Sequence, residues 1–108
     1  MNVYPTESKE EDLQIAKTII EQIGPNDFKR LGCHSAKAIK AGVQFKTQLN
    51  RMGLFAVVIR LMADDTYEVS FFKNNGIGED ITTVNDVYCD QLTKMIGEAM
   101  GFEMIKRV

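Results

Sequence analysis

The stretch at residues 43–50 reads Val43-Gln44-Phe45-Lys46-Thr47-Gln48-Leu49-Asn50, so that apolar or small side chains alternate with polar ones. Successive side chains of a β-strand point to opposite faces of a sheet. A period of two therefore predicts a strand with one face turned to a core and the other turned to water.

Two more runs follow this strand at short intervals. Residues 54–62 are almost wholly apolar apart from Arg60, which is typical of a central strand that is covered along most of its length. Asp64-Asp65 comes next, and Asp side chains favour tight reversals because they bond their own backbone. A third strand then alternates Tyr67, Val69 and Phe71 with polar residues. Together the three runs predict an antiparallel meander.

Weaker patterns extend the predicted sheet at both of its edges. A less regular strand at residues 35–40 precedes the meander, and a short edge strand at residues 81–84 follows it. Between the meander and that edge strand, the sequence Asn74-Asn75-Gly76-Ile77-Gly78 has the composition of a loop. The sheet is thus expected to contain between three and five strands.

Helical patterns lie before and after the sheet in the sequence. Residues 9–23 repeat apolar side chains at helical spacing, after a capping box that begins at Ser8 and before the stop sequence Gly24-Pro25. A second helix is predicted between Asn85, its expected N-cap, and Gly101. Its apolar stripe consists of Tyr88, Leu92, Met95, Ile96 and Ala99.

These elements predict a single α+β domain over residues 1–108, with an antiparallel sheet flanked by an N-terminal and a C-terminal helix. Each helix has one apolar stripe, so both are expected to pack on the sheet. If they share one face, the other face is open to water or to a partner. The residues expected there are Gln44, Lys46, Gln48, Arg60, Glu68 and Ser70.

Length and composition exclude several classes of protein. The chain has 108 residues, 44% of them hydrophobic and 26% charged, which is typical of one globular domain and not of a disordered chain. No apolar run reaches the ~18 residues of a membrane span, and the polar start does not match a secretory signal. A cytoplasmic protein without a membrane partner is therefore expected. Cys33 and Cys89 are expected to be free thiols, and a bridge between them requires a fold that brings them together.

The charged residues are unevenly distributed, although the net charge is only −2. Residues 31–63 contain no Asp or Glu but hold five cations, so a basic patch on an acidic body is predicted. Solvation of a sheet surface is the plainer interpretation, whereas binding of nucleic-acid phosphates or of a partner is the functional one. The candidate binding residues are Lys37, Lys40, Lys46, Arg51 and Arg60.

One aromatic side chain could add base stacking to these charges. Phe72 is out of phase with Tyr67, Val69 and Phe71, so it is a candidate for an exposed position on the polar face. The alternative, which the pattern favours, is that Phe72 packs under the second helix or at a contact between two copies.

No catalytic or metal-binding motif stands out in the sequence. The only histidine, His34, is next to Cys33, and neighbours in an extended segment point to opposite faces. The pairs Asp64-Asp65 and Glu79-Asp80 are typical of turns and solubility rather than of carboxylates held across a cleft. We therefore expect a protein that is not an enzyme, with no catalytic residue, no metal and no cofactor.

Four segments resemble a family of small proteins predicted in phages and other mobile elements. They are Gly42-Val43-Gln44-Phe45-Lys46, Val58-Ile59-Arg60-Leu61, the run from Asp65 to Lys73, and Val87-Tyr88-Cys89-Asp90-Gln91-Leu92. The resemblance covers residues 19–101 and implies the same order of helix, sheet and helix. Since that family has no established activity, the resemblance implies an origin and not a mechanism.

Three functional hypotheses follow for the sequence. In the first, the protein is a non-enzymatic phage or mobile-element accessory protein that contacts nucleic acid through its basic sheet face. In the second, it binds a host protein in the host cytoplasm, for example as an inhibitor of a defence nuclease. In the third, it is a small metal-dependent hydrolase or nuclease that uses Asp64 or Asp65. The sequence leaves the first two undecided, and self-association through an edge strand stays open as well.

Overall fold

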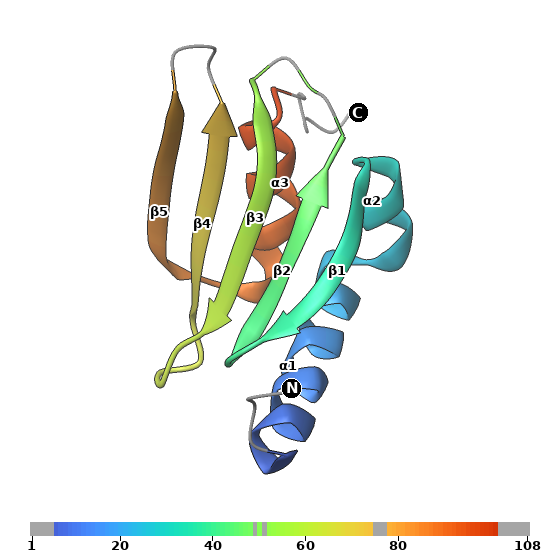
Figure 1. Ribbon diagram of the computed structural model, residues 1–108, viewed down its shortest axis with the longest axis vertical. Helices are drawn as coiled ribbons and strands as arrows, with labels where there is room; N and C mark the ends of the chain where they lie inside the picture. Colours follow the sequence, from blue (N-terminus) through green and yellow to red (C-terminus); the bar gives the residue numbers. More distant parts are fainter. Residues whose placement is uncertain (1–5, 49, 51, 75–77, 102–108) are drawn as a thin grey trace.

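The structure of the protein is a computed structural model that describes residues 6–48, 50, 52–74 and 78–101. The chain folds into an α+β domain, as predicted, and the order of its elements can be followed in Figure 1. The elements are α1 (Thr6–Ile23), α2 (Pro25–Arg30), β1 (Cys33–Ile39), β2 (Gly42–Thr47), β3 (Leu54–Leu61), β4 (Tyr67–Asn74), β5 (Glu79–Val87), the 3-10 turn η1 (Cys89–Gln91) and α3 (Leu92–Ala99).

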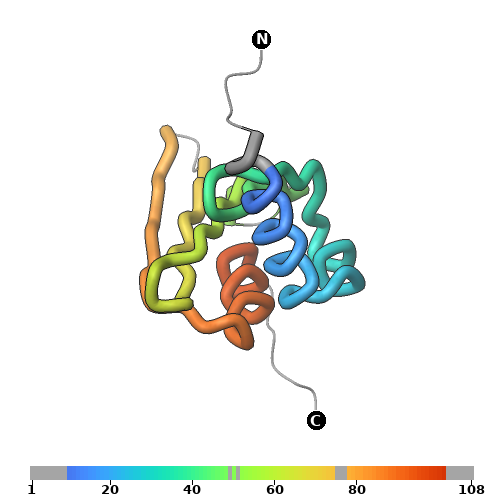
Figure 2. Tube along the Cα trace, turned by 90° about the horizontal axis from the view of Figure 1, so that it is seen from below, coloured from blue at the N-terminus to red at the C-terminus, as the bar shows by residue number. Residues whose placement is uncertain are grey.

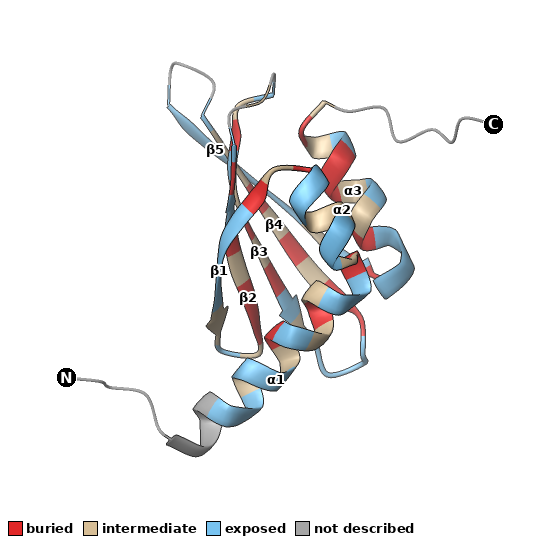
Figure 3. Cartoon of the chain, turned by 90° about the vertical axis from the view of Figure 1, so that its right-hand side faces the viewer, coloured by how far each residue is buried: buried red, intermediate tan, exposed pale blue. Residues whose placement is uncertain are grey.

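The five strands form one antiparallel sheet in the order β1-β2-β3-β4-β5, so the predicted meander is confirmed at the upper end of its expected size. All the helices lie on one face of this sheet, as the edge-on view in Figure 3 shows. Figure 2 shows α1 and α3 side by side on that face. The opposite face is therefore free of helices, and we call it the open face.

The register of the central strands assigns each side chain to one face. Val43 is paired with Ile59, and Ile59 with Val69, so this row of three fully buried residues crosses the sheet on the helix side. Ile19 of α1 and Ile96 of α3 are fully buried against the same core. Because each such side chain contributes about 1.5–3 kcal/mol when buried, this face of the sheet holds the register in place.

The first helix ends where the sequence predicted but begins earlier. Gly24 adopts φ +98°, which ends α1, and Pro25 starts α2 because its fixed φ suits the first position of a helix. The capping box at Ser8 is wrong, since α1 begins at Thr6 and Ser8 lies in its first turn. An N-cap residue precedes the helix with non-helical backbone angles, whereas Ser8 already lies within α1.

The second predicted helix starts later than expected. Asn85 and Asp86 belong to β5 and not to a helix cap, so the predicted N-cap at Asn85 is wrong. Asp86 takes φ +60° at an irregularity of the β4–β5 pairing, a backbone position that short polar side chains tolerate. The helix itself is α3, and it ends before Gly101, whose φ is +91°.

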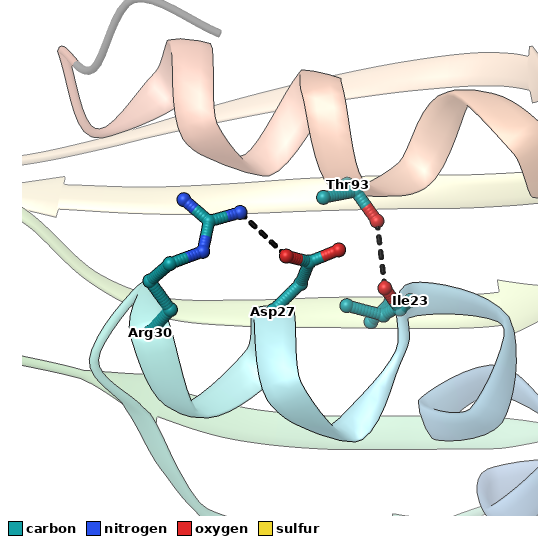
Figure 4. A network of polar contacts seen from close by, with 4 residues as sticks. All are labelled: Ile23, Asp27, Arg30 and Thr93. Carbon is teal, nitrogen blue, oxygen red and sulfur yellow. Dashed lines mark hydrogen bonds and ion pairs between the residues drawn. The ribbon is translucent and has the colours of Figure 1, made fainter.

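Polar contacts fix the helices to one another. The Thr93 hydroxyl of α3 donates to the carbonyl oxygen of Ile23 at the end of α1, over 2.9 Å (Figure 4). Within α2, Arg30 forms an ion pair with Asp27. The bond from Thr93 occupies one of the carbonyl groups that the end of a helix leaves without a partner, so it joins the two longer helices beneath the sheet.

Side chains also hold the turns between the strands. The Asn50 amide donates to the carbonyl oxygens of Gln48 and Leu54, each over 2.8 Å, and its oxygen accepts from the Leu54 amide. At the β1–β2 turn, the Asp12 carboxylate of α1 accepts from the Ala41 amide over 2.8 Å. These contacts tie the ends of β2 and β3 to fixed positions.

Among the described residues, no helix combines the length and the apolar composition of a membrane span.

Candidate nucleic-acid interface

The open face is built from the outward side chains of all five strands. The pairing places His34, Lys46, Ala56, Phe72 and Ile81 in one row across it. A second row, parallel to the first, consists of Lys37, Gln44, Val58, Ser70 and Thr83. Of the six residues expected on this face, five lie on it as predicted, and Gln48 follows the end of β2 as an exposed residue.

Three of the five predicted binding cations come together on this face. Lys37 of β1, Lys46 of β2 and Arg60 of β3 occupy outward positions of adjacent strands, and each is exposed. Lys40 is also exposed, in the turn between β1 and β2, and Arg51 lies outside the described residues. The face therefore carries a group of cations on β1, β2 and β3, which we call the cationic half.

These cations make no ion pair within the part of the chain that the structure describes, where the single ion pair joins Arg30 to Asp27. Glu68 of β4 lies opposite Arg60 in the ladder without forming an ion pair with it. On the edge strand β5, Glu79 shares the open face through its pairing with Asn74, Asp80 is paired with Lys73 and belongs to the other face, and Asp86 lies in the irregular part of the pairing. The sheet thus divides into a cationic half and an acidic β4–β5 side.

An aromatic pair lies near the border between the two halves. Phe55 of β3 and Phe72 of β4 have ring centroids 6.4 Å apart with an angle of 56° between the ring planes. Phe72 is half-buried and Phe55 is 37% exposed. The expectation that Phe72 packs under the second helix is wrong, because its ladder partners place it on the open face and Phe71 points to the core instead.

Phe55 is the site residue that the sequence did not single out. The β3–β4 register shifts between Leu54 and Ala56, so that one extra residue is inserted into β3. Leu54 stays buried while Phe55 is exposed and contacts Phe72. A hollow of about 420 Å³ adjoins Phe55, and its other lining residues are Thr47, Gly53, Leu54, Asn74 and Glu79.

The residues with potential nucleophilic chemistry do not come together in one site. Cys33 is buried at the start of β1, and burial raises the pKa of its thiol to about 12. Its neighbour His34 is exposed, with Nδ1 2.9 Å from the Ser35 hydroxyl, so the two side chains do not converge. Both cysteines are free thiols, as predicted; Cys89 is exposed and follows β5 at the opposite end of the sheet.

The paired acids in the β3–β4 turn have a structural environment. The Asp64 carboxylate accepts from the Thr66 amide over 3.2 Å and from the Thr66 hydroxyl over 2.7 Å, and these bonds lower the pKa of Asp64. Asp65 takes φ +70° in the reversal itself. Over the described residues, no three His, Cys, Asp or Glu side chains gather where they could hold a metal ion.

Three comparisons with known proteins found no match for the chain. No protein-family model matches it. No curated protein matches it either. No solved structure matches its fold. The open face must therefore be interpreted from its own chemistry.

Proposed function

We propose that the protein binds nucleic acid through the open face of its sheet. The observation that carries this proposal is the cationic half, where Lys37, Lys46 and Arg60 extend from three adjacent strands without an ion pair to a described residue. Cations that neutralise phosphates release condensed counterions, and this release is the main source of affinity for nucleic acid.

The distribution of charge supports one orientation of the ligand. The protein as a whole is acidic, with a net charge of −2, so a phosphate backbone is repelled by most of its surface. Only the cationic half is free of acidic side chains, since residues 31–63 contain none. A nucleic-acid strand is therefore expected to run over β1, β2 and β3 and to avoid the β5 edge.

Fluorescence anisotropy with a labelled oligonucleotide at several salt concentrations tests this function. Each phosphate contact to a single strand contributes about −0.7 to the slope of log K against log salt, so the four described cations predict a slope of up to about −2.8. The double variant with Lys46→Gln and Arg60→Gln should flatten this slope by about 1.4. Lys29→Gln with Lys94→Gln removes the same charge from α2 and α3 and serves as the matched control.

Affinity that does not change with salt would contradict the proposal. So would an equal loss of binding in the two double variants, since that result would indicate net charge and not the open face. Circular dichroism of all variants shows whether they are folded before binding is compared.

A protein partner is the second candidate, because the open face also exposes apolar side chains. Ile81 of β5 is 57% exposed and lies beside Phe72 in the ladder. Binding of such a partner would be abolished by Ile81→Lys and would not change in the double variant with Lys46→Gln and Arg60→Gln. Origin in a phage or mobile element, a cytoplasmic location and hydrolase activity stay predictions from the sequence.

A further inference from the structure

We infer that the ligand is single-stranded and that Phe55 and Phe72 stack its unpaired bases. This inference rests on the proposed function, because it names the class of nucleic acid that the same face would take. Its basis is the position of two aromatic rings on the open face beside cations that make no ion pair with any residue the structure describes. Each part of that arrangement constrains the ligand separately.

The irregularity in β3 brings the first ring to the face. In a regular strand, Phe55 would point to the face opposite that of its neighbour Ala56, which is the helix side. Here the insertion between Leu54 and Ala56 leaves Leu54 buried and Phe55 exposed, within contact of Phe72. Extra residues of this kind redirect a side chain, and they are over-represented next to functional sites.

The geometry of the pair leaves aromatic surface for a ligand. The two rings are tilted by 56° and their centroids are 6.4 Å apart, so neither ring covers the face of the other as a parallel stack would. Phe55 keeps 37% of its surface exposed, so a ligand can reach it. Nucleobases stack on exposed aromatic side chains with little regard to sequence, because every base has a π-face.

The distance between the rings and the cations suits a nucleotide lying across the strands. Lys46 and Phe72 lie in one row with Ala56 between them, so two strand spacings, about 10 Å, separate their backbones. Phosphates over the cationic half would thus leave bases directed toward β4. Glu68 of β4 and Glu79 of β5 repel a backbone from the β4–β5 side of the open face, which favours this orientation over its reverse.

The shape of the face disfavours a duplex. Five strands spaced by about 4.8 Å span about 19 Å, whereas the major groove of B-DNA is about 12 Å wide and admits one helix or a two-stranded ribbon. The bases of a duplex are also stacked on one another, so Phe55 and Phe72 could reach them only after unstacking. A single strand meets neither obstacle.

Three oligonucleotides of equal length separate stacking from charge: a single strand, the corresponding duplex, and a single strand of abasic nucleotides. We expect the wild-type protein to bind the single strand best. Phe55→Leu and Phe72→Leu should each weaken that binding about 5- to 150-fold, the range of one lost base stack, and should leave the salt slope unchanged. Binding to the abasic strand should be the same in both variants as in the wild type.

Tyr88→Leu is the matched control, because Tyr88 is 59% exposed and lies outside the sheet, just after β5. It should bind all three oligonucleotides like the wild type. Urea unfolding of each variant verifies that the fold is intact, and Phe55→Leu remains informative if Phe72→Leu unfolds.

Three outcomes would overturn the inference. The first is equal affinity for single strand and duplex with no effect of Phe55→Leu, while Lys46→Gln with Arg60→Gln still weakens binding; the proposed function would then stand without base stacking. The second is the absence of binding to all three oligonucleotides, which would remove the proposed function too. The third is a dimer, seen by sedimentation without nucleic acid, that Phe55→Leu dissociates, since a second copy would then cover the rings.

Discussion

Substitution of Gly42 by alanine tests the register that assigns the cations to the open face. Gly42 lies opposite Arg60 at the start of β2, where the backbones of β2 and β3 approach closely. A Cβ atom added there would be 2.0 Å from the carbonyl oxygen of Ile59 and 2.9 Å from the Cα atom of Arg60. Contacts below 3.0 Å are essentially not found, so the β3 backbone would have to retreat by about 1 Å.

The cost of that displacement can be estimated from two effects. Overpacking typically costs about 1–3 kcal/mol. The neighbouring bond from the Leu61 amide to the Ala41 carbonyl oxygen, 2.7 Å long, would weaken as well, which adds about 1 kcal/mol. Gly42→Ala should thus lower the free energy of unfolding by about 2–4 kcal/mol, a large part of the ~5–15 kcal/mol usual for a domain.

Urea unfolding followed by circular dichroism measures this loss, and the midpoint should fall by about 1–2 M at an m-value near ~2 kcal/mol/M. Gly78→Ala is the control, because a Cβ atom at Gly78 has no neighbour within 4 Å. It should change the free energy of unfolding by less than about 0.5 kcal/mol. If the two variants were equally stable, the β2–β3 register would be wrong, and a slip by one residue would turn Lys46 away from the open face.

Three further predictions concern thiols, a turn and pH. In the native protein, a thiol reagent should modify Cys89 at neutral pH and reach Cys33 only on unfolding, because Cys33 is buried and its thiol has a pKa of about 12. Mass spectrometry counts the labels, and rapid labelling of both cysteines would refute the burial of Cys33. Asn50→Ala should lower the free energy of unfolding by about 1–3 kcal/mol, because it removes three side-chain hydrogen bonds that hold the β2–β3 connection. A decrease in this free energy smaller than the error of urea unfolding would speak against those hydrogen bonds. Hydrogen bonds from Thr66 lower the pKa of Asp64 in the folded protein. The stabilising effect of the Asp64 carboxylate should therefore be complete above pH ~3.8 and disappear as pH falls through the lower folded pKa. The same pH dependence of stability in the wild type and in Asp64→Asn would contradict this.

The strands could be predicted where one face alone is buried. The alternation in residues 43–47 follows from a sheet that has helices on one side and water on the other, so Lys46 could be assigned to the open face from the sequence. Arg60 interrupts an apolar run and must point outward for the same reason. In both strands the burial of the other face leaves one choice of orientation.

The irregular positions could not be predicted, because they depend on tertiary contacts. The insertion in β3 that exposes Phe55 could not be recognised, because residues 54–59 are all apolar and each suits a buried position. Asn85 and Asp86 have the composition of a helix cap, yet they continue an edge strand that only pairing with β4 holds in place. The charges of the site were thus visible in the sequence, whereas one of its two rings was not.

Nuclear magnetic resonance of the isotope-labelled protein, titrated with an unlabelled single strand, tests most directly whether the open face is the binding surface. Amide and side-chain signals of the row that contains Lys46, Ala56 and Phe72 should shift progressively with added oligonucleotide, together with the ring signals of Phe55. Signals of the helix side, such as those of Lys94, should stay in place. Shifts confined to the helices, or no shifts at saturating oligonucleotide, would contradict the assignment of function to this face.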